Sequence, residues 1–157
     1  MHKTPEITRL INENFWTILA FAFGRPAVVK IIRDRFSGGW KYLNKTVNEL
    51  AEIQADRALL EMATQLRVLD DAEGLSKYYK ETGDDLTLGE VTQSDNKKEP
   101  LYFRDMTNKI MHAASFRWEL LMEGGPIIIC LPHDDARWKE ARIDVIALME
   151  KIGGLMH

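Results

Sequence analysis

The sequence contains little that would stabilise or anchor a chain from outside its own fold. Of its 157 residues only Cys130 is a cysteine, so no internal disulfide can form, and we expect a reducing environment. Its most apolar run, Phe15–Gly24, is much shorter than the roughly 20 residues that span a bilayer. Glu6 and Glu13 stand where a signal peptide carries positive charge. The sequence therefore predicts a cytoplasmic protein with no membrane segment.

Signatures of several enzyme and nucleic-acid-binding classes are also absent. The formal net charge is −3, so no overall positive field attracts nucleic acid, and nothing points to DNA. There is no phosphate-binding loop, dinucleotide fingerprint, GxSxG or HExxH motif. His133 lies beside Asp134 and Asp135, which we interpret as helix-capping residues, with a metal site as the alternative. We expect no cofactor and no metal.

Apolar residues recur at helical spacing through most of the chain. Thr4-Pro5-Glu6 is typical of a helix start, and Gly24 is expected to end that first helix. A second helix is expected over Pro26–Phe36, followed by a break at Ser37-Gly38-Gly39. Further helices are predicted over about 44–69, 71–80, 101–113 and 134–152, and the polar residues 84–99 are expected to form a long loop.

One segment has the pattern of a β-hairpin. Phe116–Met122 and Ile127–Leu131 are rich in aromatic and β-branched residues, and Glu123-Gly124-Gly125 supplies a turn between them. The sequence therefore predicts a mainly α single domain over residues 1–157. It would be a helical bundle of about five to six helices with one small β-hairpin, at about residues 116–131, before the C-terminal helix.

The first predicted helix is unusually apolar around Phe15–Phe23. A helix of this kind is either buried in the centre of the domain or shared with a second copy of the chain. We expect a homodimer.

Arg104, Asn108 and His112 form the constellation best suited to chemistry. Residues four apart on a helix lie on one face, so these side chains are expected to point the same way. Arginine has a planar donor fork that suits phosphate, and histidine exchanges a proton near neutral pH. Asparagine can orient a hydroxyl group. These groups suit metal-independent acid–base cleavage of RNA, in which the ribose 2′-hydroxyl attacks the phosphodiester.

A structural role explains the same three residues. Asn108 and His112 could satisfy backbone groups of the flanking loop and hairpin. Arg104 could pair with an acid from residues 48–100, which hold thirteen Asp and Glu against six Lys and Arg.

The segment Phe103–Ala113 resembles a helix of uncharacterised bacterial helical proteins with the pattern R-[DE]-x-x-N-K-I-[IM]-H-A. In those proteins a hairpin and a Trp-containing C-terminal helix follow, and Trp138–Val145 is similar to that last element. The resemblance covers roughly residues 60–150 and extends distantly to the HEPN superfamily. HEPN proteins are helical bundles that commonly dimerise, and they include metal-independent RNases of toxin and antiphage systems.

This resemblance implies a homodimeric helical domain that binds or cleaves RNA in a toxin or defence context. The HEPN catalytic motif is an arginine followed, after four to six residues, by a histidine, whereas seven residues separate Arg104 from His112. Many HEPN members are non-catalytic. The alternative function is therefore a non-enzymatic structural or protein-interaction module, also homodimeric.

Overall fold

A computed structural model describes residues 4–36 and 41–155. The helices are α1 (Thr4–Arg35), α2 (Lys41–Lys45), α3 (Ala51–Glu73), α4 (Leu75–Thr82), α5 (Phe103–Met111) and α6 (Val145–Gly154), and a π-helical turn, η1 (Thr46–Leu50), joins α2 to α3. The strands are β1 (Gly89–Gln93), β2 (Lys98–Leu101), β3 (Ala113–Glu119), β4 (Ile127–Pro132) and β5 (Trp138–Asp144).

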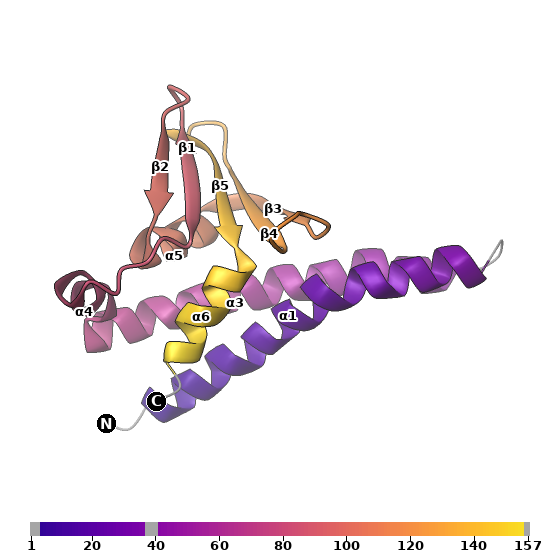
Figure 1. The fold of residues 1–157 in the computed structure, drawn as a ribbon, viewed down its shortest axis with the longest axis horizontal. Coiled ribbons are helices and arrows are strands. Elements are labelled where there is room, and N and C mark those ends of the chain that lie inside the picture. The colour runs from indigo at the N-terminus through magenta and orange to yellow at the C-terminus, as the bar shows by residue number, and fades with distance from the viewer. Residues whose placement is uncertain (1–3, 37–40, 156–157) are drawn as a thin grey trace.

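These strands form one five-stranded antiparallel sheet in the order β2-β1-β5-β4-β3 (Figure 1). The fold is therefore α+β, and the predicted mainly α bundle with a single small hairpin is wrong. The hairpin itself is confirmed, since Phe116 pairs with Cys130 and Glu119 with Ile127. It is one part of the sheet rather than an insertion in a bundle.

The segment predicted as a long loop, residues 84–99, contains β1 and the start of β2. Only Val91 is both apolar and buried within β1, so the alternation typical of a strand is too short to stand out. The hairpin formed by β1 and β2 turns near Asn96, which has a positive φ of 69°. Strand β1 is held by its neighbours on both sides, β2 and β5, and this pairing is a tertiary property.

The predicted C-terminal helix over residues 134–152 is half strand and half helix. Residues 138–144, WKEARID, contain good helix formers, but pairing with β1 and β4 outweighs that local preference. Ala141 and Ile143 point into the core from β5. The predicted caps Asp134 and Asp135 are therefore wrong, and Asp144 is the N-cap of α6, where its carboxylate accepts from the Ile146 and Ala147 N–H groups.

Helix α1 passes without interruption through Gly24 and Pro26. The predicted stop at Gly24 and the separate helix from Pro26 are therefore wrong. An internal proline removes one helix hydrogen bond, but α1 is packed along α3, and that packing stabilises the continuous helix. The break predicted at Ser37-Gly38-Gly39 lies outside the described residues.

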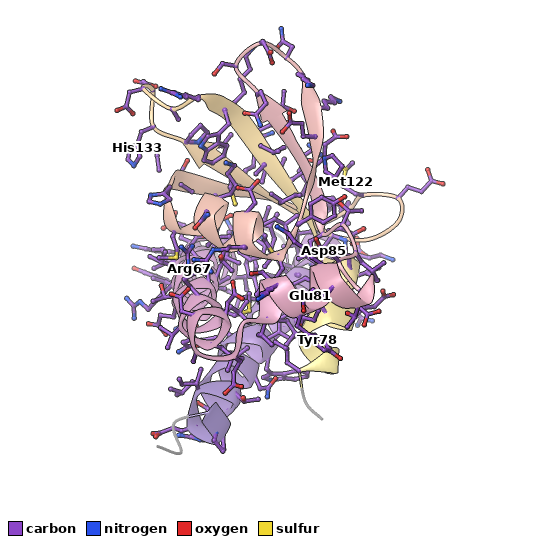
Figure 2. The ribbon with its side chains drawn as sticks, turned by 90° about the vertical axis from the view of Figure 1, so that its left-hand side faces the viewer. Arg67, Tyr78, Glu81, Asp85, Met122 and His133 are labelled. Atoms are coloured by element: carbon purple, nitrogen blue, oxygen red, sulfur yellow. The ribbon has the colours of Figure 1, made fainter. Side chains whose placement is uncertain are left out.

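The hydrophobic core lies between the sheet and the helices. In Figure 1 and Figure 2 the sheet lies on one side of α3 and the N-terminal half of α1 on the other. Buried side chains of α1, α3, α5, α6 and the strands form one continuous cluster. The end of the α1–α3 pair that carries α2 extends past the sheet (Figure 1).

Candidate functional site

Helix α5 carries the predicted site residues and lies against α3. Its buried side, formed by Phe103, Met106 and Ile110, packs into the core. Thr107 is also buried, and its hydroxyl donates to the backbone oxygen of Arg104 at 2.7 Å. The first predicted turn, at residues 101 and 102, is absent because Leu101 belongs to β2.

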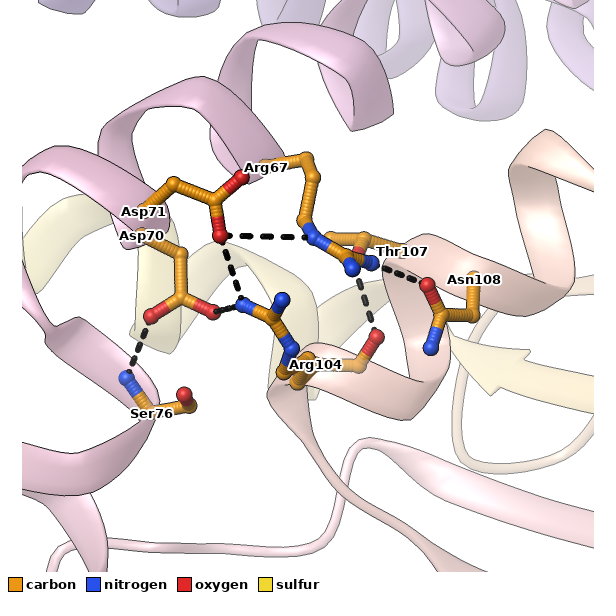
Figure 3. Close-up of polar contacts among 7 residues, drawn as sticks. All are labelled: Arg67, Asp70, Asp71, Ser76, Arg104, Thr107 and Asn108. Carbon is orange, nitrogen blue, oxygen red and sulfur yellow. Dashed lines mark hydrogen bonds and ion pairs between the residues drawn. The ribbon is translucent and has the colours of Figure 1, made fainter.

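Arg104 is paired with two carboxylates of α3 (Figure 3). Its Nη1 donates to Asp70 Oδ2 at 2.8 Å and to Asp71 Oδ1 at 3.0 Å. The Asp70 side chain is only 1% exposed, and its other oxygen accepts from the Ser76 N–H at 2.7 Å. The hydrogen bond to Asp70 is the main cause that raises the pKa of Arg104, and the hydrogen bond to Asp71 adds to it. One terminal nitrogen of the guanidinium is therefore engaged within the protein, while the Arg104 side chain remains 42% exposed.

Asn108 is joined to the same face of α3 through Arg67. The Arg67 Nη1 donates to Asn108 Oδ1, and its Nε lies 3.6 Å from Asp71 Oδ1. That Nε is buried and has no hydrogen-bond partner among residues 4–36 and 41–155. The longer ion pair with Asp71 therefore partly offsets the cost of burying it. Arg67, Asp70, Asp71, Arg104 and Asn108 thus form one network, which we call the α3–α5 network (Figure 3).

His112 lies apart from the α3–α5 network. It is the C-cap residue of α5, where its backbone N–H donates to the backbone oxygen of Asn108 at 3.0 Å. Its side chain is exposed. Within the described part of the chain, no hydrogen bond or ion pair reaches its imidazole. The structure therefore brings Arg104 and Asn108 together through α3, but not with the imidazole of His112.

Three members of the α3–α5 network, Arg67, Asp70 and Asp71, were not predicted as site residues. Their spacing of three and four residues places them on one face of a helix, which the sequence could have revealed. Their partner on α5 could not be read from spacing, because α3 and α5 are separated by α4, β1 and β2.

Two further polar contacts, both partly buried, lie outside the predicted site. Trp118 Nε1 of β3 donates to Asp56 Oδ1 of α3 at 2.7 Å, and burial raises the pKa of Asp56. Lys151 Nζ of α6 donates to the backbone oxygen of Asp84 at 2.6 Å and lies 3.9 Å from the centroid of the Tyr79 ring. Burial lowers the pKa of Lys151. Both contacts join elements far apart in the sequence.

A well-formed open pocket lies away from the α3–α5 network. It has a volume of about 470 Å³ and lies between α1 and the β3–β4 connection, with Arg25, Val29, Trp118 and Leu121 among its lining residues. His133 lies in the β4–β5 connection, at the outer part of the sheet and away from Arg67 (Figure 2). Among residues 4–36 and 41–155, no group of three or more His, Cys, Asp or Glu side chains could hold a metal ion.

No protein-family model, curated protein or solved structure matches the chain.

Proposed function

We propose that the chain is a non-enzymatic protein-interaction module that works as a homodimer. The observation that carries the proposal is the pairing of Arg104 with Asp70 and Asp71. Two carboxylates beside an arginine neutralise its charge and repel a phosphate anion, so Arg104 is a poor ligand for the phosphate of a substrate although its side chain is 42% exposed. Arg104 and Asn108 instead connect α5 to α3.

Surface composition supports the interaction role. Large apolar side chains are exposed along α1, where Trp16 is 70%, Phe23 48% and Ile31 52% exposed. Contiguous exposed apolar surface in a folded domain marks a site of association. Burial raises the pKa of the Cys130 thiol to about 12, so this thiol is a poor nucleophile, in keeping with a non-enzymatic role.

The RNA-cleavage hypothesis has one observation in its favour, the exposed imidazole of His112. Purified wild-type protein and His112→Ala should be incubated with mixed-sequence RNA in the presence of EDTA. Our proposal expects no cleavage by either protein. Cleavage by the wild type that is lost in a folded His112→Ala variant would replace the interaction module with an RNase.

The homodimer is tested separately by sedimentation velocity of the wild-type chain. We expect a concentration-dependent equilibrium between monomer and dimer in the micromolar range. A chain that sediments only as a monomer up to about 100 µM, where a dissociation constant near 1 mM would still be detectable, contradicts the homodimeric part of the proposal.

A further inference from the structure

The outward face of α1 carries an apolar stripe with coiled-coil spacing. Trp16, Ala20, Phe23 and Ala27 follow one another at intervals of four, three and four residues, and all are exposed. This interval pattern places side chains on one seam of a helix, where a second helix can pack. Large and small side chains alternate along the seam.

The stripe lies opposite the face of α1 that packs into the core. The buried face consists of Ile11, Phe15, Ile18 and Ala22, which are also spaced by three and four residues. At 100° per residue the centres of these two sets of four residues are about 140° apart. The buried face is covered by the domain itself, whereas Trp16 on the stripe is 70% exposed within the described part of the chain.

Charged residues continue the same spacing at both ends of the stripe. Arg9 and Glu13 precede Trp16, and Lys30 and Asp34 follow Ala27. All four are exposed, and Arg9 and Glu13 form an ion pair of 2.6 Å. Along the helix the seam is therefore positive, negative, large, small, large, small, positive and negative.

This order is complementary to itself when the direction of the second helix is reversed. Opposite charges then face each other at both ends, and each large side chain faces a small one in the middle. The facing pairs are Arg9 with Asp34, Glu13 with Lys30, Trp16 with Ala27, and Ala20 with Phe23, each made twice about a two-fold axis. Large-to-small packing lets the helix axes approach to roughly 8–9 Å.

We propose that a second copy of the chain docks along this stripe, with the two α1 helices antiparallel and the two-fold axis between Ala20 and Phe23. The inference rests on the homodimeric function proposed above and assigns its surface. The contact runs from Arg9 to Asp34, a length of about 37 Å along the helix. A parallel arrangement places Glu13 beside Glu13 and Lys30 beside Lys30, and like charges in contact disfavour it.

A membrane is the competing occupant of this surface. By length and composition alone α1 could cross a bilayer over Pro5–Arg35, and 22% of its most apolar window is buried. However, the stretch between Glu13 and Lys30 spans only about 24 Å, against a hydrocarbon core of about 30 Å. Arg25 lies within that stretch and pairs with Glu52 at 3.3 Å. The charge order of the stripe favours a second copy.

The first experiment compares two variants that each replace an exposed apolar side chain by an acid. Phe23→Glu places two unpaired carboxylates at the centre of the dimer. We expect the dissociation constant of the dimer to rise by about 100-fold or more. Leu121→Glu is the matched control, because Leu121 is 86% exposed on the β3–β4 connection and lies off the stripe. It should dimerise like the wild type in sedimentation velocity. Circular dichroism should show both variants folded.

The second experiment exchanges charges. Glu13→Lys alone and Lys30→Glu alone each turn two attractive pairs into repulsive ones, and each should weaken the dimer about tenfold. The double variant Glu13→Lys/Lys30→Glu restores opposite charges across the interface and should recover most of the affinity. Failure of the double variant to recover overturns the antiparallel pairing.

The outcomes separate this inference from the proposed function. A wild type that dimerises while Phe23→Glu has the same affinity keeps the homodimer and removes the stripe as its surface. A wild type that stays monomeric removes both. A monomer that instead co-sediments with vesicles of phosphatidylcholine and phosphatidylglycerol, in a manner lost in Phe23→Glu, assigns the stripe to a membrane surface and overturns the inference.

Discussion

At the scale of single residues, burial distinguishes two adjacent aspartates that look alike in the sequence. Asp70 and Asp71 both accept from Arg104, but the Asp70 side chain is 1% exposed and that of Asp71 is 59% exposed. A buried carboxylate depends on its partners because water cannot replace them. An exposed carboxylate is solvated with or without its ion pair.

Asp70→Asn should therefore lower the free energy of unfolding by about 1–3 kcal/mol, because its amide would turn a donor toward either Arg104 or the Ser76 N–H. Asp71→Asn makes the same chemical change and should lower the free energy of unfolding by less than about 1 kcal/mol. Urea unfolding of the two variants measures the difference. Equal costs would show that the α3–α5 network does not depend on burial.

Asp56 gives the fold a pH dependence of known sign. Burial is the main cause of its raised pKa, and Glu52 adds to it, while the hydrogen bond from Trp118 opposes it. Between its ordinary pKa of 3.8 and its raised value, the folded state binds more protons than the unfolded state. The contribution of Asp56 to stability is therefore present at low pH and is lost as the pH rises through the raised pKa.

We expect the free energy of unfolding of Asp56→Asn, relative to the wild type, to increase as the pH rises through this window. The asparagine oxygen can still accept from Trp118, so the contact is retained while the charge is removed. Unfolding in urea at a series of pH values above 3 measures it. Glu61→Gln, on the exposed side of the same helix, is the control and should follow the wild type.

At the scale of elements, two glycines have opposite requirements. Gly24 lies in the interior of α1, and a Cβ there would meet nothing within 4 Å. Gly89 begins β1 with φ +154°, and a Cβ there would lie 1.8 Å from the Arg142 backbone oxygen of β5. Only Gly89 is required by the backbone and by close approach of a neighbouring strand.

Gly24→Ala should raise the free energy of unfolding by about 0.5–1 kcal/mol, because alanine is the better helix former. Gly89→Ala should lower it by about 2–4 kcal/mol, through backbone strain and overpacking against β5. Thermal and urea unfolding of both variants tests the pair of predictions. Destabilisation by Gly24→Ala would argue against a continuous α1.

At the scale of the whole molecule, dimerisation ties stability to concentration. A dimer that unfolds to two separate chains melts at a higher temperature when the protein is more concentrated. For a chain of this length, we expect the midpoint to rise by up to about 4 °C between 1 and 100 µM, where the full rise applies to a chain that stays dimeric up to its midpoint. Differential scanning calorimetry or fluorescence measures it, with Phe23→Glu as the variant whose midpoint should stay constant. A constant midpoint in the wild type contradicts a dimer coupled to folding.

Much of the helical part of this fold could be predicted from the sequence. The apolar positions of α1 and α3 recur at helical intervals, and the hairpin of β3 and β4 has its own turn residues. The same intervals place Trp16 and Phe23 on one seam of α1. These features depend on spacing within one segment, which the order of amino acids determines by itself.

Only the tertiary structure decided the sheet and the candidate site. Residues 138–144 favour a helix locally and become β5 because two neighbouring strands provide its hydrogen bonds. Arg104 suits phosphate as an isolated side chain, but folding places it beside Asp70 and Asp71, which lie more than thirty residues earlier. Spacing along the chain specifies which side chains share a face, whereas the partner across that face is set by packing between elements distant in sequence.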